Sequence, residues 1–143
     1  MSVTSSLPVS IADINYGQHM GNDRFLAFFH EARLNFLASV SASEVDIGED
    51  TGLIMTEANV RYLGQVVRGD LLETTVDVLE VKKSGFVLGY EMYRSQDGKR
   101  VASGTTALCA FKYAEGKIAR LPGGFKQALE AHLRQPEGDR AGS

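Results

Sequence analysis

The stretch DINYGQHMGNDRFLAFFHEAR, residues 13–33, decides the fold, because its two halves follow different rules. Residues 13–22 mix an acid, amides, a histidine and glycines, which favour turns over regular structure. From residue 22 onward, apolar side chains recur at helical spacing and polar ones fall on the opposite side. The stretch therefore predicts a polar loop leading into an amphipathic helix. The predicted buried positions are Phe25, Phe28, Phe29, Ala32 and Phe36.

The predicted helix has a recognisable start. Gly21 and Asn22 suit the non-helical geometry of a cap, and Asp23 puts a negative charge in the first turn, where the helix dipole favours it. We expect the helix to end between Ala38 and Ser43.

After the helix, the period of the apolar residues changes to two, which is typical of strands. Asp97-Gly98 is the strongest hairpin signal, and short turns between the segments predict an antiparallel meander. The apolar phase changes near Val78, which predicts a bulge or strong twist. The predicted strands are residues 7–12, 53–64, 70–81, 85–96 and 99–113, and a short amphipathic helix is predicted at 122–134.

One long helix against one curved sheet predicts the α+β class. We expect a single domain over residues 7–134, with flexible tails at 1–6 and 135–143. A sheet of this kind has exposed edges that must be covered or paired. We therefore expect a homodimer in which two edge strands form one continuous sheet.

Composition argues against several classes of protein. With 15 basic and 18 acidic residues, the formal charge of -3 does not favour nucleic-acid binding. The single cysteine, Cys109, cannot form an internal disulfide. No apolar run approaches the ~20 residues needed to span a bilayer. The first ten residues also lack the pattern of a secretory signal. We expect a cytoplasmic protein with no membrane partner.

Residues 13–33 resemble the signature of hotdog-fold thioesterases of the 4-hydroxybenzoyl-CoA thioesterase type, in which a Gly-His-x-Asn-Asn-like turn leads into a helix ending Phe-Glu-x-Ala-Arg. His19 matches the histidine, Asn22 the second asparagine and Phe25 the usual tyrosine. NVRYLGQVVRGDLL (59–72) and VASGTTALCAF (101–111) are also similar to family segments. The resemblance covers about residues 7–134 and implies a hotdog fold: a long helix wrapped by a curved antiparallel sheet. It also implies a homodimer or a homotetramer (a dimer of dimers) that hydrolyses acyl-CoA thioesters.

The chain departs from the family pattern where the catalytic acid is expected. Counting back from His19, Asn15 stands in the slot of the catalytic aspartate, and Gly21 replaces the first asparagine. Alignment on the longer loop of other family members puts Asp13 in the acidic slot instead. Both alignments stay open.

Thioester hydrolysis requires an activated water and donors for the charge that develops on the carbonyl oxygen. The first N–H groups of a helix lack intrahelical partners, so those of Met20, Gly21 and Asn22 are candidate oxyanion donors. Asp13 or Asn15 is the candidate for positioning water, although both are also typical of structural Asx turns. His19 either transfers a proton or fixes the loop.

The resemblance also suggests substrate contacts. Phe25 is a candidate for the acyl pocket as well as the core, and four basic residues are candidates for the phosphates of CoA, although most exposed basic side chains are only solvated. These four are Arg61, Arg68, Lys82 and Lys83. No Cys or His spacing suits zinc. We expect no metal and no cofactor beyond the CoA of the substrate.

The leading functional hypothesis is an acyl-CoA thioesterase. Its rival is a non-catalytic module that binds acyl-CoA or lipid, which the asparagine in the acidic slot makes plausible. A dehydratase on the same fold needs a histidine and acid pair, for which the sequence offers weak candidates.

Overall fold

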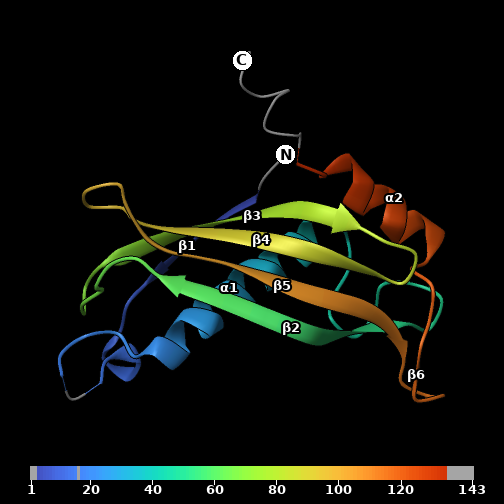
Figure 1. The fold of residues 1–143 in the computed structure, drawn as a ribbon, viewed down its shortest axis with the longest axis horizontal. Helices are drawn as coiled ribbons and strands as arrows, with labels where there is room; N and C mark the ends of the chain where they lie inside the picture. The colour runs from blue at the N-terminus through green and yellow to red at the C-terminus, as the bar shows by residue number, and fades with distance from the viewer. Residues whose placement is uncertain (1–2, 16, 135–143) are drawn as a thin grey trace, which may run out of the picture.

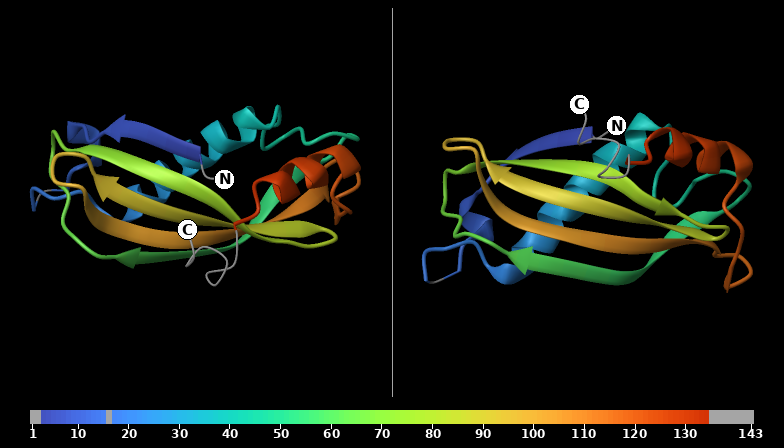
Figure 2. Two further views of the ribbon diagram at one scale, coloured as in Figure 1. Left: turned by 90° about the horizontal axis from the view of Figure 1, so that it is seen from above. Right: turned by 45° about the horizontal axis from the view of Figure 1, so that its top comes forward.

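A computed structural model describes residues 3–15 and 17–134. It forms an antiparallel sheet with strand order β1-β3-β4-β5-β2, and β6 pairs with β5. Helix α1 lies across one face of the sheet, and α2 lies near the end of β3 (Figure 1 and Figure 2). This confirms the predicted α+β class. The elements are β1 (Val3–Pro8), a 3-10 turn (Ile11–Asp13), α1 (Asn22–Ser39), β2 (Gly52–Tyr62), β3 (Leu71–Val81), β4 (Gly85–Arg94), β5 (Lys99–Lys112), β6 (Lys117–Ile118) and α2 (Gly123–Ala131).

Helix α1 begins and buries its side chains as its sequence predicts. Gly21 is the N-cap in extended conformation, and Asp23 lies in the first turn. The helix ends at Ser39, within the predicted range. Its apolar stripe packs on the sheet and forms the centre of the core. The five predicted stripe residues, Phe25, Phe28, Phe29, Ala32 and Phe36, are all buried.

Strands β3, β4 and β5 form the predicted meander, and the register of β3 on β4 shifts between Val78 and Glu80 at the predicted bulge. The predicted meander is wrong for β2, which pairs with β5 instead of β3. The loop after β2 crosses the β4–β5 end of the sheet, where it bonds to Arg94 and Gln96, and so separates β2 from β3. The N-terminal strand is displaced from its prediction: β1 covers Val3–Pro8 instead of residues 7–12. It pairs with β3, so the folded part of the chain extends into the segment expected to be a tail. The expected tail over 135–143 lies outside the described residues.

A polar network is buried between α1 and the sheet. Arg33 is 6% exposed; its Nε donates to Glu44 Oε2 at 2.9 Å and its Nη1 to the Tyr90 hydroxyl at 3.2 Å. The Tyr90 hydroxyl also bonds Thr106 Oγ1 at 2.7 Å. Burial raises the pKa of Tyr90, so the hydroxyl stays neutral. Burial alone would raise the pKa of Glu44, but hydrogen bonds from His30 and Arg33 outweigh it and hold that pKa below its ordinary value.

The edge strand β2 is poorly covered. Residues 54–59 are exposed on both faces of the strand, including Ile54 at 37% and Met55 at 46%. Leu26 and Leu34 of α1 are each 38% exposed. An open edge strand that carries exposed apolar side chains is suited to pairing with another strand.

Candidate active site at the start of helix α1

A pocket of about 320 Å³ lies between the loop before α1, the first turn of α1 and the end of β2. Five residues singled out from the sequence line it: Asn15, His19, Met20, Asn22 and Phe25. The opposite wall comes from the end of β2 and the loop after it, with Tyr62, Gly64, Gln65 and Val66. The polar loop and the helix start therefore border a cavity.

Asp13 does not line this pocket. Its side chain is buried, and Oδ1 accepts from Arg24 Nε and Nη2, both at 3.0 Å. Its Oδ2 accepts from the backbone N–H of Ser10 at 2.9 Å and from the Ser10 hydroxyl at 3.2 Å. Both carboxylate oxygens are therefore engaged in holding the loop against α1, which leaves this acid poorly placed to bind water.

Asn15 forms the Asx turn that is typical of asparagine in a loop. Its Oδ1 accepts from Gly17 N–H at 2.9 Å and from His19 N–H at 3.4 Å. Within residues 3–15 and 17–134, neither Asn15 Nδ2 nor the His19 ring has a hydrogen-bond partner. The pocket thus receives one amide donor and one imidazole with free hydrogen-bonding capacity.

Two of the three predicted oxyanion donors are already paired within the chain. Met20 N–H donates to Val66 O at 2.8 Å, and Gly21 N–H donates to Asp13 O at 3.1 Å. The reason is that two loops cover the helix start: the loop before α1, where Ile14 and Met20 form a β-bridge, and the loop after β2, which contains Val66. Asn22 N–H has no acceptor among the described residues, so it alone of the three is free for a ligand.

The predicted CoA-binding cations are not brought together. Arg68 borders a hollow of about 540 Å³ next to the pocket, behind the same loop. Lys82 and Lys83 follow the C-terminal end of β3, whereas the pocket lies near its N-terminal end. An 11-residue strand is roughly 36 Å long, so its length separates these lysines from the pocket. Arg61 lines a separate hollow with Ser103. In one chain, only Arg68 is near the pocket.

Tyr62 and Gln65 were not singled out from the sequence. The Tyr62 hydroxyl donates to Asn22 O at 3.2 Å, and its ring meets Phe25 edge-on, with centroids 5.1 Å apart. Gln65 lies in a loop whose sequence gives only turn signals. For Tyr62, the one available sequence signal of a role in a site was a large aromatic side chain with a polar hydroxyl at the end of a predicted strand.

The described residues that line the pocket offer amides, a hydroxyl and an imidazole, but no carboxylate. Such a set can donate hydrogen bonds to a carbonyl oxygen at the positive end of the α1 dipole. The imidazole is the group there whose ring nitrogens can both accept and donate a proton.

Among residues 3–15 and 17–134, no group of three His, Cys, Asp or Glu side chains is arranged to hold a metal ion. Neither of the two α-helices in these ranges combines the length and the apolar character that a membrane span requires.

Two similar proteins are named as hydrolases of CoA thioesters. The 1,4-dihydroxy-2-naphthoyl-CoA hydrolase of Thermosynechococcus vestitus is 36% identical over 83 residues, which make up 57% of this chain. That match spans only 56% of the relative's own length. The long-chain acyl-CoA thioesterase FadM of Escherichia coli is 23% identical over 117 residues, which cover 82% of this chain and 89% of FadM.

A solved structure has the same fold. A 1,4-dihydroxy-2-naphthoyl-CoA thioesterase from Synechocystis matches with a TM-score of 0.83 at 22% identity, covering 95% of this chain and 100% of the other. The likeness confirms the hotdog fold that the sequence resemblance implies. The family model described as the thioesterase-like superfamily matches residues 9–129. On that match, the chain belongs to the thioesterase-like superfamily.

Proposed function

We propose that this protein hydrolyses acyl-CoA thioesters to a free acid and CoA in the pocket at the start of α1. One observation carries the proposal: in a thioesterase-like chain, an unpaired helix-start N–H, an asparagine amide and a histidine line one cavity. The names of both relatives, which specify CoA thioesters, support CoA as the carrier.

In this proposal, Asn22 N–H and Asn15 Nδ2 donate to the thioester carbonyl oxygen. Negative charge grows on that oxygen as water attacks, so donors at the positive end of a helix stabilise the transition state more than the ground state. Loss of one such donor in other hydrolases costs about 100 to 1000-fold in turnover. Asn15 therefore acts through its amide rather than as a base.

His19 takes the proton of the attacking water in this mechanism. The oxygen of water bonds to the carbonyl carbon, the carbon–sulfur bond breaks, and the CoA sulfur recovers the proton from the imidazolium. Asp13 takes no part in proton transfer; it holds the loop through Arg24. Met20 and Gly21 fix the helix start through the hydrogen bonds that their N–H groups already make.

The acyl group packs against Phe25 and the ring of Tyr62, which meet at the pocket wall. Arg68, two positions after Val66 in the same loop, binds a phosphate of CoA. Lys82 and Lys83 are too far along β3 to reach the same CoA from within one chain, so they contribute only where a second chain brings its own hairpin to the pocket. Arg61 is exposed, and the proposal gives it no contact with the substrate.

We also propose a homodimer that pairs through β2, with a dimer of dimers as a further prediction. The support is the open edge of β2 and the exposed apolar side chains of Ile54 and Met55 on that strand. Because Tyr62 is in the same strand, a partner on this edge would lie next to the pocket. Sedimentation velocity at micromolar concentration tests this: a dimer that Met55→Glu converts to monomer supports it, and a wild-type monomer removes it.

A non-catalytic acyl-CoA binding module remains the second candidate. The observation in its favour is that the described residues lining the pocket include no carboxylate. In the family that the sequence resembles, a carboxylate is expected to activate the water. Without a general base, hydrolysis loses on the order of 100 to 10,000-fold.

Steady-state thiol release from short, long and aromatic acyl-CoAs tests the proposal. We expect release by the wild type, and turnover at least tenfold lower in Asn15→Ala and His19→Ala because each removes a group from the pocket. Asp46→Ala is the matched control, since Asp46 Oδ1 makes a comparable turn contact with Gly48 N–H at 3.0 Å outside the pocket. Its turnover should stay near wild type.

Full turnover in both Asn15→Ala and His19→Ala would reject these assignments. Tight binding of acyl-CoA without any thiol release would favour the binding module instead.

A further inference from the structure

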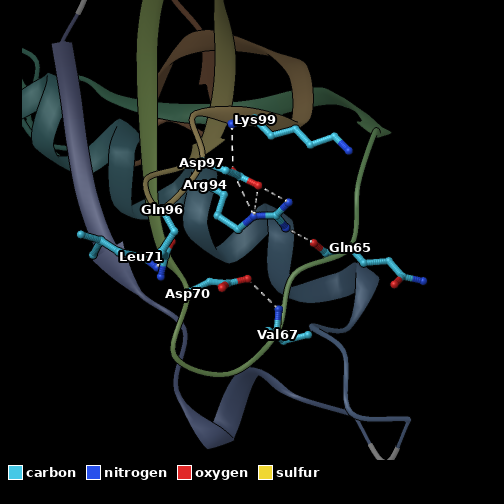
Figure 3. A network of polar contacts seen from close by, with 8 residues as sticks. All are labelled: Gln65, Val67, Asp70, Leu71, Arg94, Gln96, Asp97 and Lys99. Atoms are coloured by element: carbon cyan, nitrogen blue, oxygen red, sulfur yellow. Dashed lines mark hydrogen bonds and ion pairs between the residues drawn. The ribbon is translucent and has the colours of Figure 1, made fainter.

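An arginine outside the pocket donates a hydrogen bond to one of the pocket walls (Figure 3). Arg94 is the last residue of β4, and its Nη1 donates to the backbone carbonyl of Gln65 at 2.6 Å. The two residues are 29 positions apart in the chain. Since Gln65 lines the pocket and Arg94 does not, this bond joins the β4–β5 turn to the site wall.

An ion pair with Asp97 orients the Arg94 side chain. Its carboxylate accepts from Arg94 Nη2 at 2.9 Å and from Nε at 3.2 Å, and it also accepts from Lys99 N–H at 3.1 Å. A planar guanidinium whose Nε and Nη2 face one carboxylate turns its Nη1 away from that carboxylate. The side chain of Arg94 is 20% exposed, so the turn presents Nη1 to the loop in a largely fixed direction.

The same turn also holds the far end of the loop. Gln96 Nε2 donates to Gly69 O at 3.2 Å, and Gln96 Oε1 accepts from Leu71 N–H at 3.3 Å. Asp70 Oδ2 accepts from Val67 N–H at 2.9 Å and closes the loop on itself. The loop from Gln65 to Leu71 is thus attached at both ends to one β-turn.

The wall is coupled to the helix start as well. Val66, 1% exposed, follows Gln65 and accepts the hydrogen bond from Met20 N–H at 2.8 Å. In Figure 3 the Gln65 side chain points away from Arg94. The arginine therefore fixes the backbone of the wall and leaves the Gln65 amide free.

We propose that Arg94, aimed by Asp97, is a positioning residue that holds the Gln65–Val66 wall of the pocket in its ligand-binding position. The effect on catalysis rests on the function proposed above, whereas the effect on the wall does not. Arg94 touches neither substrate nor reacting atoms, so its removal lowers the fraction of molecules with a formed pocket and leaves the chemistry of the bound complex intact.

This predicts a particular kinetic pattern. Apparent affinity falls in proportion to the fraction of molecules whose pocket is formed. We expect Arg94→Ala to raise KM for the best acyl-CoA at least about fivefold while kcat stays within about twofold, since only free-enzyme populations change. Arg94→Lys keeps the charge but has one ammonium for both partners, so it should recover part of the affinity.

Amide hydrogen exchange followed by NMR tests the wall without any substrate. Met20 N–H reports on the wall because it donates to Val66 O. We expect Arg94→Ala to speed exchange at Met20 at least about tenfold, with core strand amides such as that of Leu88 unchanged. Arg100→Ala is the matched control: Arg100 pairs with Glu91 on the same hairpin and has no described contact with the loop.

Unchanged KM together with unchanged Met20 exchange in Arg94→Ala would overturn the proposal. Equal acceleration at Met20 and Leu88, or the same effect from Arg100→Ala, would overturn it too, because it would show general destabilisation. If Arg94→Ala does not fold, Arg94→Lys is measured in the same two ways. If the wild type releases no thiol, the proposed function fails, and exchange at Met20 still decides the role of Arg94.

Discussion

Removal of one buried hydroxyl should destabilise the protein measurably. Tyr90→Phe keeps the ring that stacks on Phe29 with centroids 4.6 Å apart, and it deletes only the bonds to Thr106 and Arg33. These partners are 1% and 6% exposed, so water cannot readily replace the hydroxyl. A buried donor left unpaired costs about 1 to 3 kcal/mol, and more beside a charge. We therefore expect a loss of about 2 to 3 kcal/mol, or roughly 6 to 10 °C in Tm for a chain of this size.

Urea unfolding followed by circular dichroism measures this loss, and Tyr93→Phe is the control. Tyr93 is in the same strand, is half-buried, and its hydroxyl has no hydrogen-bond partner among the described residues. Its loss should cost less than about 0.5 kcal/mol. If Tyr90→Phe is no more destabilising than Tyr93→Phe, the network under α1 does not have the energetic role assigned to it.

Two further predictions concern packing and pH. Gly104→Ala should cost at least about 2 kcal/mol in urea unfolding, because a Cβ there meets Asn59 O and lies 2.6 Å from the Phe29 ring; the neighbouring Ser103→Ala should cost little. Burial alone would raise the pKa of Glu44, but its histidine and arginine partners hold that pKa below the ordinary 4.5 in the folded protein. The ionised Glu44 side chain therefore stabilises the fold fully above pH 4.5, and this stabilisation is lost as the pH falls through the lower pKa of the folded state. Glu44→Gln should therefore be less stable than wild type near neutral pH, with the gap closing in acid; a gap independent of pH contradicts this.

The fold followed from the sequence wherever one face of an element is buried. The stripe from Phe25 to Phe36 and the change of phase at Val78 both report burial, so both features appeared where expected. The first strand was misplaced because VTSSLP, residues 3–8, is mostly small and polar. Its structure comes from pairing with β3, a tertiary contact that local periodicity does not contain.

The site was only partly predictable from the sequence, because its geometry depends on contacts between distant residues. The first N–H groups of a helix lack intrahelical acceptors, so the sequence predicted unpaired N–H groups at residues 20–22. The pairing of Met20 N–H with Val66 O depends on a loop more than forty positions away, which the local sequence does not reveal. The engagement of Asp13 by Arg24 depends on how the loop folds back on α1. Gln65 was missed because its position is set by Arg94, and turn residues alone do not reveal which cavity they border.

The central claim is that the pocket at the start of α1 cleaves the thioester that it binds. The most direct test is a single turnover with enzyme in excess over acyl-CoA, quantifying bound intact thioester and released CoA in the same quenched samples. We expect the intact thioester to disappear as CoA and free acid appear, more slowly in Asn15→Ala. Intact acyl-CoA that stays bound while no CoA is released would contradict the account.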